Sequence, residues 1–342
     1  MKGFGFTQHG GPERLDWVDV PEPFPGPGEV RVKLAAAGFN RLDRFVLAGI
    51  PGVRVELPHV LGSDGAGFID SVGPGVTDLA PGKAVLLNPG RWDTTCPACL
   101  RGNEALCPEY RILGEHTQGT LAEFAVVPRR SVYPKPERLT FAEAAAAPLV
   151  FQTAWRALLT VGGLAPGETV AIVGAGGGVA LAALQVAKLK GATVVVLSRS
   201  EAKLARSQEL GADATLVLPP DGSFDRSLWQ WSGKRGVDLI FDSVGAETVP
   251  RSLRALARGG RVVVVGGTTG ATVPIDLRTL FWRNASLRGS TMAGRAEFEA
   301  MYAALADGSL RPVLDRTFPF SEARAAYERF LAPDLFGKVV VA

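Results

Sequence analysis

The stretch VAIVGAGGGVALAALQVAK, residues 170–188, most constrains the fold of this 342-residue chain. An apolar run is followed at once by a glycine cluster and then by a segment with helical periodicity. Further apolar runs, TVVVL (193–197), VDLIF (237–241) and RVVVV (261–265), alternate with amphipathic stretches. Such runs are typical of parallel strands buried on both faces. We therefore expect an α/β fold with a doubly wound parallel sheet over residues 151–291.

The first 125 residues have a different pattern. Short apolar segments such as EVRVKLAAAG (29–38) and GKAVLLN (82–88) alternate with Pro/Gly clusters, which indicates a β-rich domain that is partly closed like a barrel. The segment after residue 291 contains two helical patterns and the final strand GKVVVA, and it is too short for a core of its own. We expect residues 1–150 to form one domain that residues 292–342 complete.

Composition excludes several classes of function. The net charge is only +3, and basic and acidic residues are interspersed, so no nucleic-acid-binding stripe is present. No apolar run reaches about 18 residues, which argues against a membrane span. The start MKGFGFTQHGGPERLDW has no apolar signal segment, and three cysteines cannot pair completely. We expect a cytoplasmic protein that binds neither nucleic acid nor membrane.

The glycine cluster lies between a predicted strand and a predicted helix, the context of a dinucleotide site. Glycine lets the backbone approach a pyrophosphate, whose charge is stabilised by the amides and dipole of the helix N-terminus. A tight turn with no ligand is the alternative. The expected pyrophosphate-binding residues are Gly174, Gly176, Gly177, Gly178 and Val179.

The end of the next strand indicates which dinucleotide is bound. An NAD enzyme usually carries an acidic residue here for the ribose 2′-hydroxyl, whereas this chain has Ser198, Arg199 and, in the following helix, Lys203. Two cations favour the 2′-phosphate of NADPH over NADH. Alternatively, Arg199 and Lys203 are solvated residues of a helix start. Four residues at later strand ends should line the same cleft, namely Asp242, Gly245, Gly266 and Gly267.

All three cysteines lie within the segment DTTCPACLRGNEALC (93–107), at Cys96, Cys99 and Cys107. Three thiols in one short loop suggest a metal, but tetrahedral zinc needs a fourth ligand. A Cys-x-x-Cys redox pair is the competing interpretation, and it leaves Cys107 without a role.

The whole chain resembles the medium-chain dehydrogenase/reductase superfamily. The resemblance rests on GFNRLDRFVLAG (38–49), LGSDGAGFIDSVGPGV (61–76), GEHTQGTLAEFAVVP (114–128) and GKVVV (337–341), with the cysteine and glycine loops. It implies a GroES-like β-barrel domain, a Rossmann domain and a nicotinamide-dependent oxidoreductase. It also implies a homodimer or homotetramer, through sheet extension at ATVPIDL (271–277) or SLRGST (286–291).

In zinc alcohol dehydrogenases of this superfamily, four structural-zinc ligands are spaced 3, 3 and 8 residues apart. The cysteines match the last three, and the first position is Asp93. A carboxylate is an acceptable zinc ligand. The resemblance therefore implies one structural Zn²⁺ per chain, held by Asp93 and the three cysteines. Because aspartate is a harder ligand than cysteine, loss of the metal during evolution is the alternative.

The catalytic zinc ligands of the same enzymes are not matched. Their positions carry Asn40, Ser63, Asp64 and approximately Phe151. One carboxylate does not hold a catalytic zinc. His59 and His116 are the imidazoles that a relocated metal would have to recruit, although both are explained more simply as packed residues.

Asn40 stands where the zinc enzymes have their first cysteine ligand. In this feature the chain resembles the zinc-free quinone oxidoreductase and enone reductase branch of the superfamily. This implies hydride transfer from NADPH to a quinone or an α,β-unsaturated carbonyl, a small-molecule substrate. Asn40 would donate a hydrogen bond to the substrate carbonyl, with Asp43, Ser63 and Asp64 in the same pocket. Phe151 and Thr153 would adjoin the nicotinamide, and water would deliver the proton because no dedicated general acid is evident.

Two other functions remain open at this point. One is an alcohol or aldehyde dehydrogenase with an unconventional catalytic metal. The other is an NADPH-binding scaffold protein without turnover.

Overall fold

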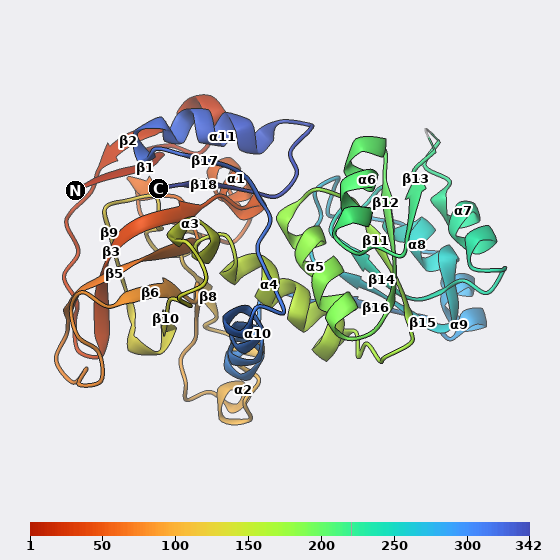
Figure 1. The fold of residues 1–342 in the computed structure, drawn as a ribbon, viewed down its shortest axis with the longest axis horizontal. Helices are drawn as coiled ribbons and strands as arrows, with labels where there is room; N and C mark the ends of the chain where they lie inside the picture. The colour runs from red at the N-terminus through yellow and green to blue at the C-terminus, as the bar shows by residue number, and fades with distance from the viewer. Residues whose placement is uncertain (220) are drawn as a thin grey trace. The chain divides into compact units, whose positions relative to one another are not determined.

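Two units make up the chain in the computed structural model, which describes residues 1–219 and 221–342 (Figure 1). Met1–Leu149 and Gly294–Ala342 form the first, here called the β-rich unit. Val150–Ala293 form the second, here called the α/β unit. The expected fold class, a β-rich domain with a Rossmann-type parallel sheet, is confirmed.

The β-rich unit is built around strand β3 (Glu29–Gly38), which pairs antiparallel with β5 (Asp64–Val72) and β9 (Phe124–Pro128). Alternate residues of β3, such as Val30 and Val32, are fully buried, as expected for a sheet with one face on a core. The other strands are β1 (Lys2–Phe6), β2 (Asp16–Asp19), β4 (His59–Val60), β6 (Ala84–Leu87), β7 (Gly90–Arg91), β8 (Arg111–Ile112), β10 (Val132–Pro134), β17 (Leu314–Phe318) and β18 (Lys338–Val341).

The C-terminal strand β18 is part of this sheet. Its residues pair antiparallel with the end of β3, Val340 opposite Gly38, and parallel with β17. The all-apolar triplet Val339–Val341 is fully buried, which fixes the strand in register. This pairing places Lys338 beside the end of β3 although 298 residues separate it from Asn40.

Four helices of the β-rich unit have between four and nine residues, and α10 has 13. The helix α1 follows β3 directly, and α11 packs on β17 and β18. Their bounds are α1 (Arg41–Ala48), α2 (Pro97–Leu100), α3 (Phe141–Ala144), α10 (Arg295–Asp307) and α11 (Ala323–Leu331), with 3-10 turns η1 (Pro12–Arg14), η2 (Glu104–Leu106), η3 (Arg129–Ser131) and η5 (Phe320–Glu322).

The α/β unit contains a six-stranded parallel sheet in the order β13-β12-β11-β14-β15-β16. Reversal of strand order on either side of β11 defines a doubly wound sheet, which binds ligands at the carboxyl ends of its strands. The strand bounds are β11 (Thr169–Val173), β12 (Thr193–Ser198), β13 (Ala214–Val217), β14 (Val237–Asp242), β15 (Leu256–Val264) and β16 (Ser286–Gly289).

Helices cover both faces of this sheet, which explains the continuous apolar strands. Phe224 and Leu228 of α7 and Leu253 of α8 share one buried cluster with sheet residues. The helices α5 and α6 contact β11, β12 and β13 and lie in front of the sheet in Figure 1. The helix bounds are α5 (Gly178–Leu189), α6 (Glu201–Glu209), α7 (Phe224–Trp231), α8 (Val249–Ala255) and α9 (Leu277–Arg283).

The segment that precedes the sheet is helical but interrupted. After α3, the helix α4 (Pro148–Trp155) begins with a proline, which is favoured at the first helical position. It continues as a π-helical turn, η4 (Arg156–Val161). In the described part of the chain, no helix has the length and apolar character needed to cross a membrane.

Candidate functional site

The turn from β3 into α1 is held by a buried aspartate. Asp43 Oδ2 accepts a hydrogen bond of 2.7 Å from the Asn40 amide, and Asp43 Oδ1 accepts one of 3.0 Å from the Gly62 amide. Asn40 and Asp43 form a capping box at the start of α1. Burial raises the pKa of Asp43 to about 6, although both amides oppose the shift. Asp43 therefore links the turn between β3 and α1 to the segment that carries Gly62, and each of its carboxylate oxygens accepts a hydrogen bond.

A buried lysine lies beside the same turn. Lys338 Nζ is 2.5 Å from Asn40 Oδ1 and 2.9 Å from Asp64 Oδ2, and its side chain is only 4% exposed. The second Asp64 oxygen accepts a hydrogen bond of 2.8 Å from the Leu149 amide. Asn40, Asp64 and Lys338, here called the lysine triad, thus form a closed polar cluster. In the sequence, Lys338 was noted only as part of the predicted strand GKVVV. No local pattern indicated that its side chain would contact Asn40 and Asp64.

The lysine triad leaves Asn40 without a free donor. The side-chain nitrogen Nδ2 of Asn40 donates to Asp64 Oδ2 at 2.9 Å and to the Gly38 carbonyl at 3.4 Å. The side-chain oxygen Oδ1 accepts a hydrogen bond from Lys338. The expected hydrogen bond from Asn40 to a substrate is therefore replaced by bonds within the protein. In contrast, Ser63 is completely buried, and its Oγ has no hydrogen-bond partner within residues 1–219 and 221–342. Ser63, which directly precedes Asp64 in the chain, is thus an unused donor.

Neither His59 nor His116 belongs to a second metal group. His59 Nε2 is 3.0 Å from the Gly114 carbonyl, and His116 Nδ1 accepts a hydrogen bond of 3.1 Å from the Ile112 amide. Burial lowers the pKa of both rings. Both imidazoles therefore hold the 112–120 loop in its conformation.

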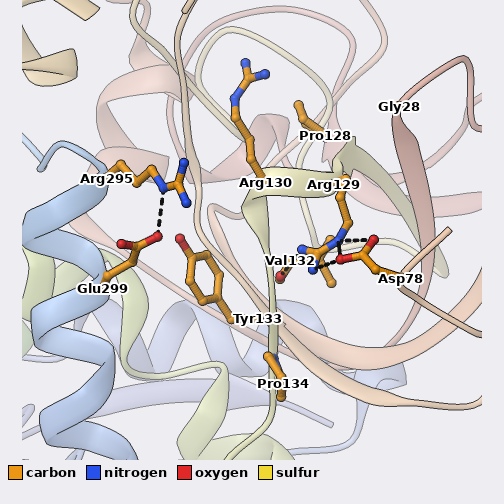
Figure 2. Close-up of a pocket in the computed structure, with 10 residues that line it drawn as sticks. All are labelled: Gly28, Asp78, Pro128, Arg129, Arg130, Val132, Tyr133, Pro134, Arg295 and Glu299. Atoms are coloured by element: carbon orange, nitrogen blue, oxygen red, sulfur yellow. Dashed lines mark hydrogen bonds and ion pairs between the residues drawn. The ribbon is translucent and has the colours of Figure 1, made fainter. Parts of the chain in front are cut away.

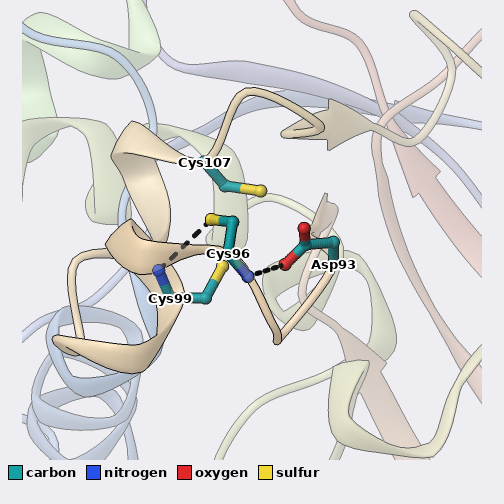
Figure 3. A group of neighbouring side chains, drawn as sticks. All are labelled: Asp93, Cys96, Cys99 and Cys107. Carbon is teal, nitrogen blue, oxygen red and sulfur yellow. Dashed lines mark hydrogen bonds between the residues drawn. The ribbon is translucent and has the colours of Figure 1, made fainter.

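The predicted zinc ligands do come together. One ligand atom each from Asp93, Cys96, Cys99 and Cys107 lies within 4.8 Å of the other three (Figure 3). Ligands of a tetrahedral zinc at ~2.0–2.3 Å lie about 3.5 Å apart, so a small contraction completes the site. The described residues contain no other group of three or more potential His, Cys, Asp or Glu ligands this close together.

Backbone amides prepare two of these ligands to be anionic. Asp93 Oδ1 accepts hydrogen bonds from the Thr95 and Cys96 amides at 2.6 and 2.8 Å, which lower the pKa of Asp93. The Cys99 amide lies 3.5 Å from Cys96 Sγ and lowers the pKa of that thiol. Burial raises the pKa of the Cys99 thiol to about 12, so this ligand would lose its proton only to a bound metal. Three sulfurs and one carboxylate are nevertheless a ligand set that zinc accepts, so the donor set fits a zinc ion.

A surface hollow of about 510 Å³ is lined in part by residues of η3 and α10 (Figure 2). Its arginines are engaged: Arg129 pairs with Asp78, and Arg295 pairs with Glu299 at 2.8 Å. Arg130 donates a hydrogen bond of 2.6 Å to the Trp92 carbonyl, directly before Asp93. Arg130 therefore supports the backbone next to Asp93, and the three arginines of the hollow are all engaged within the protein.

The glycine loop lies between β11 and α5, and two of its glycines have a positive φ. Gly174 and Gly176 have φ values of +97° and +89°, which favour glycine. A Cβ on Gly177, the N-cap of α5, would meet nothing within 4 Å, and no described side chain caps this helix. With Gly178 and the half-buried Val179 in its first turn, α5 presents its amides to an open cradle, which fits a pyrophosphate.

The later strand ends lie close to one another. A Cβ on Gly245 would be 2.7 Å from Gly267 Cα, and one on Gly266 would be 3.1 Å from the Ser243 carbonyl. Asp242 is fully buried, and its carboxylate accepts hydrogen bonds from Val244, Gly245, Thr248 and Ser252. Asp242 therefore shapes this loop, and both of its carboxylate oxygens already accept hydrogen bonds within the protein.

The residues at the end of β12 differ in exposure. Ser198 is buried and accepts a hydrogen bond of 3.2 Å from the Ser200 amide, Arg199 is exposed, and Lys203 is half-buried in α6.

The two residues of α4 that were expected beside the nicotinamide, Phe151 and Thr153, are buried, and Thr153 Oγ1 is 4.0 Å from Met292 Sδ.

Comparisons with known proteins cover nearly the whole chain. The family described as "Alcohol dehydrogenase GroES-like domain" matches residues 26–137, and "Zinc-binding dehydrogenase" matches residues 178–307. A zinc-type alcohol dehydrogenase-like protein of Schizosaccharomyces pombe is 32% identical, with 94% of this chain and 93% of that protein covered. The acryloyl-coenzyme A reductase of Metallosphaera sedula is also 32% identical, with coverage of 94% and 95%. A crystal structure of an NAD-dependent alcohol dehydrogenase has a TM-score of 0.93 and 41% identity, with coverage of 100% and 99%.

Proposed function

Because the chain belongs to the medium-chain dehydrogenase/reductase superfamily and is a nicotinamide-dependent oxidoreductase, we propose that it reduces a quinone or an α,β-unsaturated carbonyl without a catalytic metal. The similarity to an acryloyl-coenzyme A reductase supports an acceptor whose C=C bond is conjugated with a carbonyl.

The lysine triad is the observation that carries this proposal. By resemblance, Asn40, Ser63 and Asp64 occupy positions of catalytic-zinc ligands, and only Asp64 offers a metal-binding anion. That carboxylate is already paired with the Lys338 ammonium at 2.9 Å and buried. A second cation next to Lys338 would be repelled at this distance. The donor set therefore does not fit zinc, and we derive no step through one.

Ser63 and Lys338 provide the polar groups for the acceptor. When it is bound, the reduced nicotinamide supplies the hydride. The Ser63 hydroxyl, buried and unpartnered in the described chain, donates to the acceptor carbonyl oxygen as negative charge develops there. The Lys338 ammonium supplies a positive potential in the same buried region and keeps Asn40 and Asp64 in place. A conjugated acceptor needs only this modest assistance, since its carbonyl already withdraws electrons.

NADPH is the proposed cofactor. The open cradle at α5 fits a pyrophosphate, and the exposed Arg199 at the end of β12 is available to a 2′-phosphate. The ratio of kcat/KM for NADPH to that for NADH should exceed one, and Arg199→Asp should invert it. A wild-type ratio below one, as in an enzyme that prefers NADH, would contradict this assignment.

One structural zinc is proposed for the cysteine lobe. Asp93, Cys96, Cys99 and Cys107 would hold it, and its role would be to close a loop that has few apolar contacts of its own. We also propose a homodimer formed through the exposed edge strand β16. The other expected segment, residues 271–277, contains no strand.

Oxidation of an alcohol is the second candidate, favoured by the 41% identical alcohol dehydrogenase structure. One experiment separates the candidates: cofactor turnover is measured with 2-cyclohexen-1-one, crotonyl-CoA, 1,4-benzoquinone, and with primary and secondary alcohols plus NADP⁺ or NAD⁺. We expect reduction of the conjugated acceptors and one zinc per chain by metal analysis. Alcohol oxidation that requires a second zinc would overturn the proposal, and cofactor binding without turnover would indicate a scaffold.

A further inference from the structure

Residues 113–120 pack directly on the segment that carries Ser63. Gly114 has φ +78°, and a Cβ there would lie 2.2 Å from the Gly62 carbonyl oxygen. The Thr120 amide donates to the Gly62 carbonyl at 2.9 Å, and its hydroxyl donates to the Asp64 carbonyl at 2.8 Å. Ser63 directly follows Gly62, and Glu115 directly follows Gly114. The Cα atom of each is therefore about 3.8 Å from the Cα atom of one of the two glycines in contact.

Glu115 differs from the other buried acids near the triad because its carboxylate has no hydrogen-bond partner in the described chain. The residue is 9% exposed, and the nearest basic atom is His116 Nδ1, 4.0 Å from Glu115 Oε2. Burial raises the pKa of Glu115 to about 7. Thr117 Oγ1, on the same loop, is likewise buried without a partner among the described residues. Three polar groups without a hydrogen-bond partner in the described chain, Ser63 Oγ, the Glu115 carboxylate and Thr117 Oγ1, thus belong to residues within three positions of Gly62 or Gly114.

The other titratable groups nearby are committed to structure. Asp43 uses both oxygens on backbone amides. His59 is bound to the Gly114 carbonyl, and His116 accepts from the Ile112 amide with a pKa lowered by burial and by Arg111. Among these acids, Glu115 is thus the one that can lose and regain a proton without breaking a hydrogen bond in the described chain.

We propose that Glu115 is the general acid that protonates the α-carbon of an unsaturated carbonyl acceptor, an inference that rests on the function proposed above. The α-carbon lies two bonds from the carbonyl oxygen, so a substrate held by Ser63 brings it toward the neighbouring loop. The hydride forms the new C–H bond at the β-carbon, and the C=C electron pair moves toward the carbonyl. The Glu115 proton then forms the C–H bond at the α-carbon, and the carboxylate regains a proton from water through its exposed 11%.

Glu115→Gln tests this role because glutamine keeps the shape and removes the acidic proton. Its kcat should fall roughly 100-fold with 2-cyclohexen-1-one. With 1,4-benzoquinone it should stay within about twofold, since a reduced quinone needs no proton on carbon. In the wild type, kcat for the enone should fall above pH 7 while the quinone rate does not. Glu123→Gln, an exposed acid at the end of the same loop region, is the matched control.

The outcomes separate this proposal from the proposed function. An equal loss with both acceptors, or no loss with the enone, would show that Glu115 is not the acid, even though the enzyme is a reductase. A wild type that reduces neither acceptor would instead refute the function itself. If the glutamine variant does not fold, the two wild-type pH profiles decide, because coincident profiles contradict the proposal.

Discussion

At the scale of residues, the candidate site is defined by charges that the chain itself supplies. Lys338 is buried against Asp64, so the positive charge in this region is covalently fixed and hydrogen-bonded. Removal of one partner of a buried ion pair leaves the other charge unsolvated, which costs far more than loss of an exposed pair. The triad therefore contributes to both stability and electrostatics.

Lys338→Met should lower the free energy of unfolding by about 3–5 kcal/mol, because it leaves the Asp64 carboxylate buried and unpaired. Lys338→Met combined with Asp64→Asn should regain most of this stability. Lys2→Met is the control, since the Lys2–Asp19 pair is exposed and should contribute under about 1 kcal/mol. Denaturant unfolding measures all four proteins, and equal losses for Lys338→Met and Lys2→Met would contradict the assignment.

Ser63→Ala should reduce kcat for the conjugated acceptor roughly 10²-fold, since it removes the proposed donor to the developing oxyanion. Stability should hardly change, because Ser63 Oγ has no partner in the described chain. Thr120→Val is the comparison: its hydroxyl bonds Asp64, so it should cost about 1 kcal/mol of stability. Steady-state kinetics and thermal unfolding measure the two effects. If both variants lost stability and neither lost activity, Ser63 would not be the donor to the substrate.

Glu115 should also make stability depend on pH. Its folded pKa of about 7 exceeds the ordinary value of 4.5, so its contribution is full below pH 4.5 and is lost as pH rises through 7. Glu115→Gln should therefore match the wild type near pH 4.5 and become more stable than it by pH 8, by about 1.4 kcal/mol per unit of pKa difference. Urea titrations at pH 4.5, 6 and 8 measure this, and a constant difference would contradict it.

At the scale of elements, the cysteine lobe depends on its ligands rather than on apolar packing. Its buried cluster contains little more than Trp92, Cys99 and Cys107, and α2 has only four residues. Such an element does not bury enough surface to offset its ordering entropy. The structural zinc proposed above would compensate for this by joining four side chains of the lobe.

Cys107→Ser should lower the zinc content from about one to near zero per chain. The exposed bond after Arg101, within the lobe, should then be cut by trypsin on the order of 10-fold faster, as expected for about 1.4 kcal/mol of lost local stability. Metal analysis and timed proteolysis check this together. Leu189→Ala, an exposed change in α5, is the control, and unchanged proteolysis in the zinc-free variant would argue against a structural metal.

At the scale of the whole molecule, the edge of the parallel sheet is unprotected. The outer strand β16 is mostly exposed, and Phe281 and Trp282 of the preceding helix α9 are 61% and 67% exposed. An open edge with adjacent aromatic surface favours pairing with a second chain. This is the physical basis of the proposed homodimer.

Leu287→Lys with Trp282→Glu should convert the dimer to a monomer, because charges on an edge strand oppose edge-to-edge pairing. Leu189→Glu, an exposed leucine outside this edge, should leave the dimer intact. Light scattering of the three proteins gives their masses. A monomeric wild type, or a dimer that survives the double substitution, would place the interface elsewhere or remove it.

Local patterns predicted much of this molecule. The apolar runs and the glycine cluster predicted the doubly wound sheet, because strands buried on both faces require continuous apolar sequence. The three cysteines in one short loop suggested a metal site, and the resemblance to zinc alcohol dehydrogenases added Asp93; the four side chains do lie together in the structure. The sequence did not predict that Asn40 would be saturated by hydrogen bonds, since its partner Lys338 is 298 residues away.

The sequence by itself determined the fold class, the position of the glycine loop and the grouping of the cysteines, all of which depend on neighbours along the chain. Only the tertiary structure decided which polar atoms near Asn40 are occupied and which remain free. Lys338 reaches Asp64 because β18 pairs with β3, and the Gly114 that precedes Glu115 packs on the Gly62 that precedes Ser63. Such contacts arise from long-range pairing, which fixes hydrogen-bond partners that no local pattern encodes.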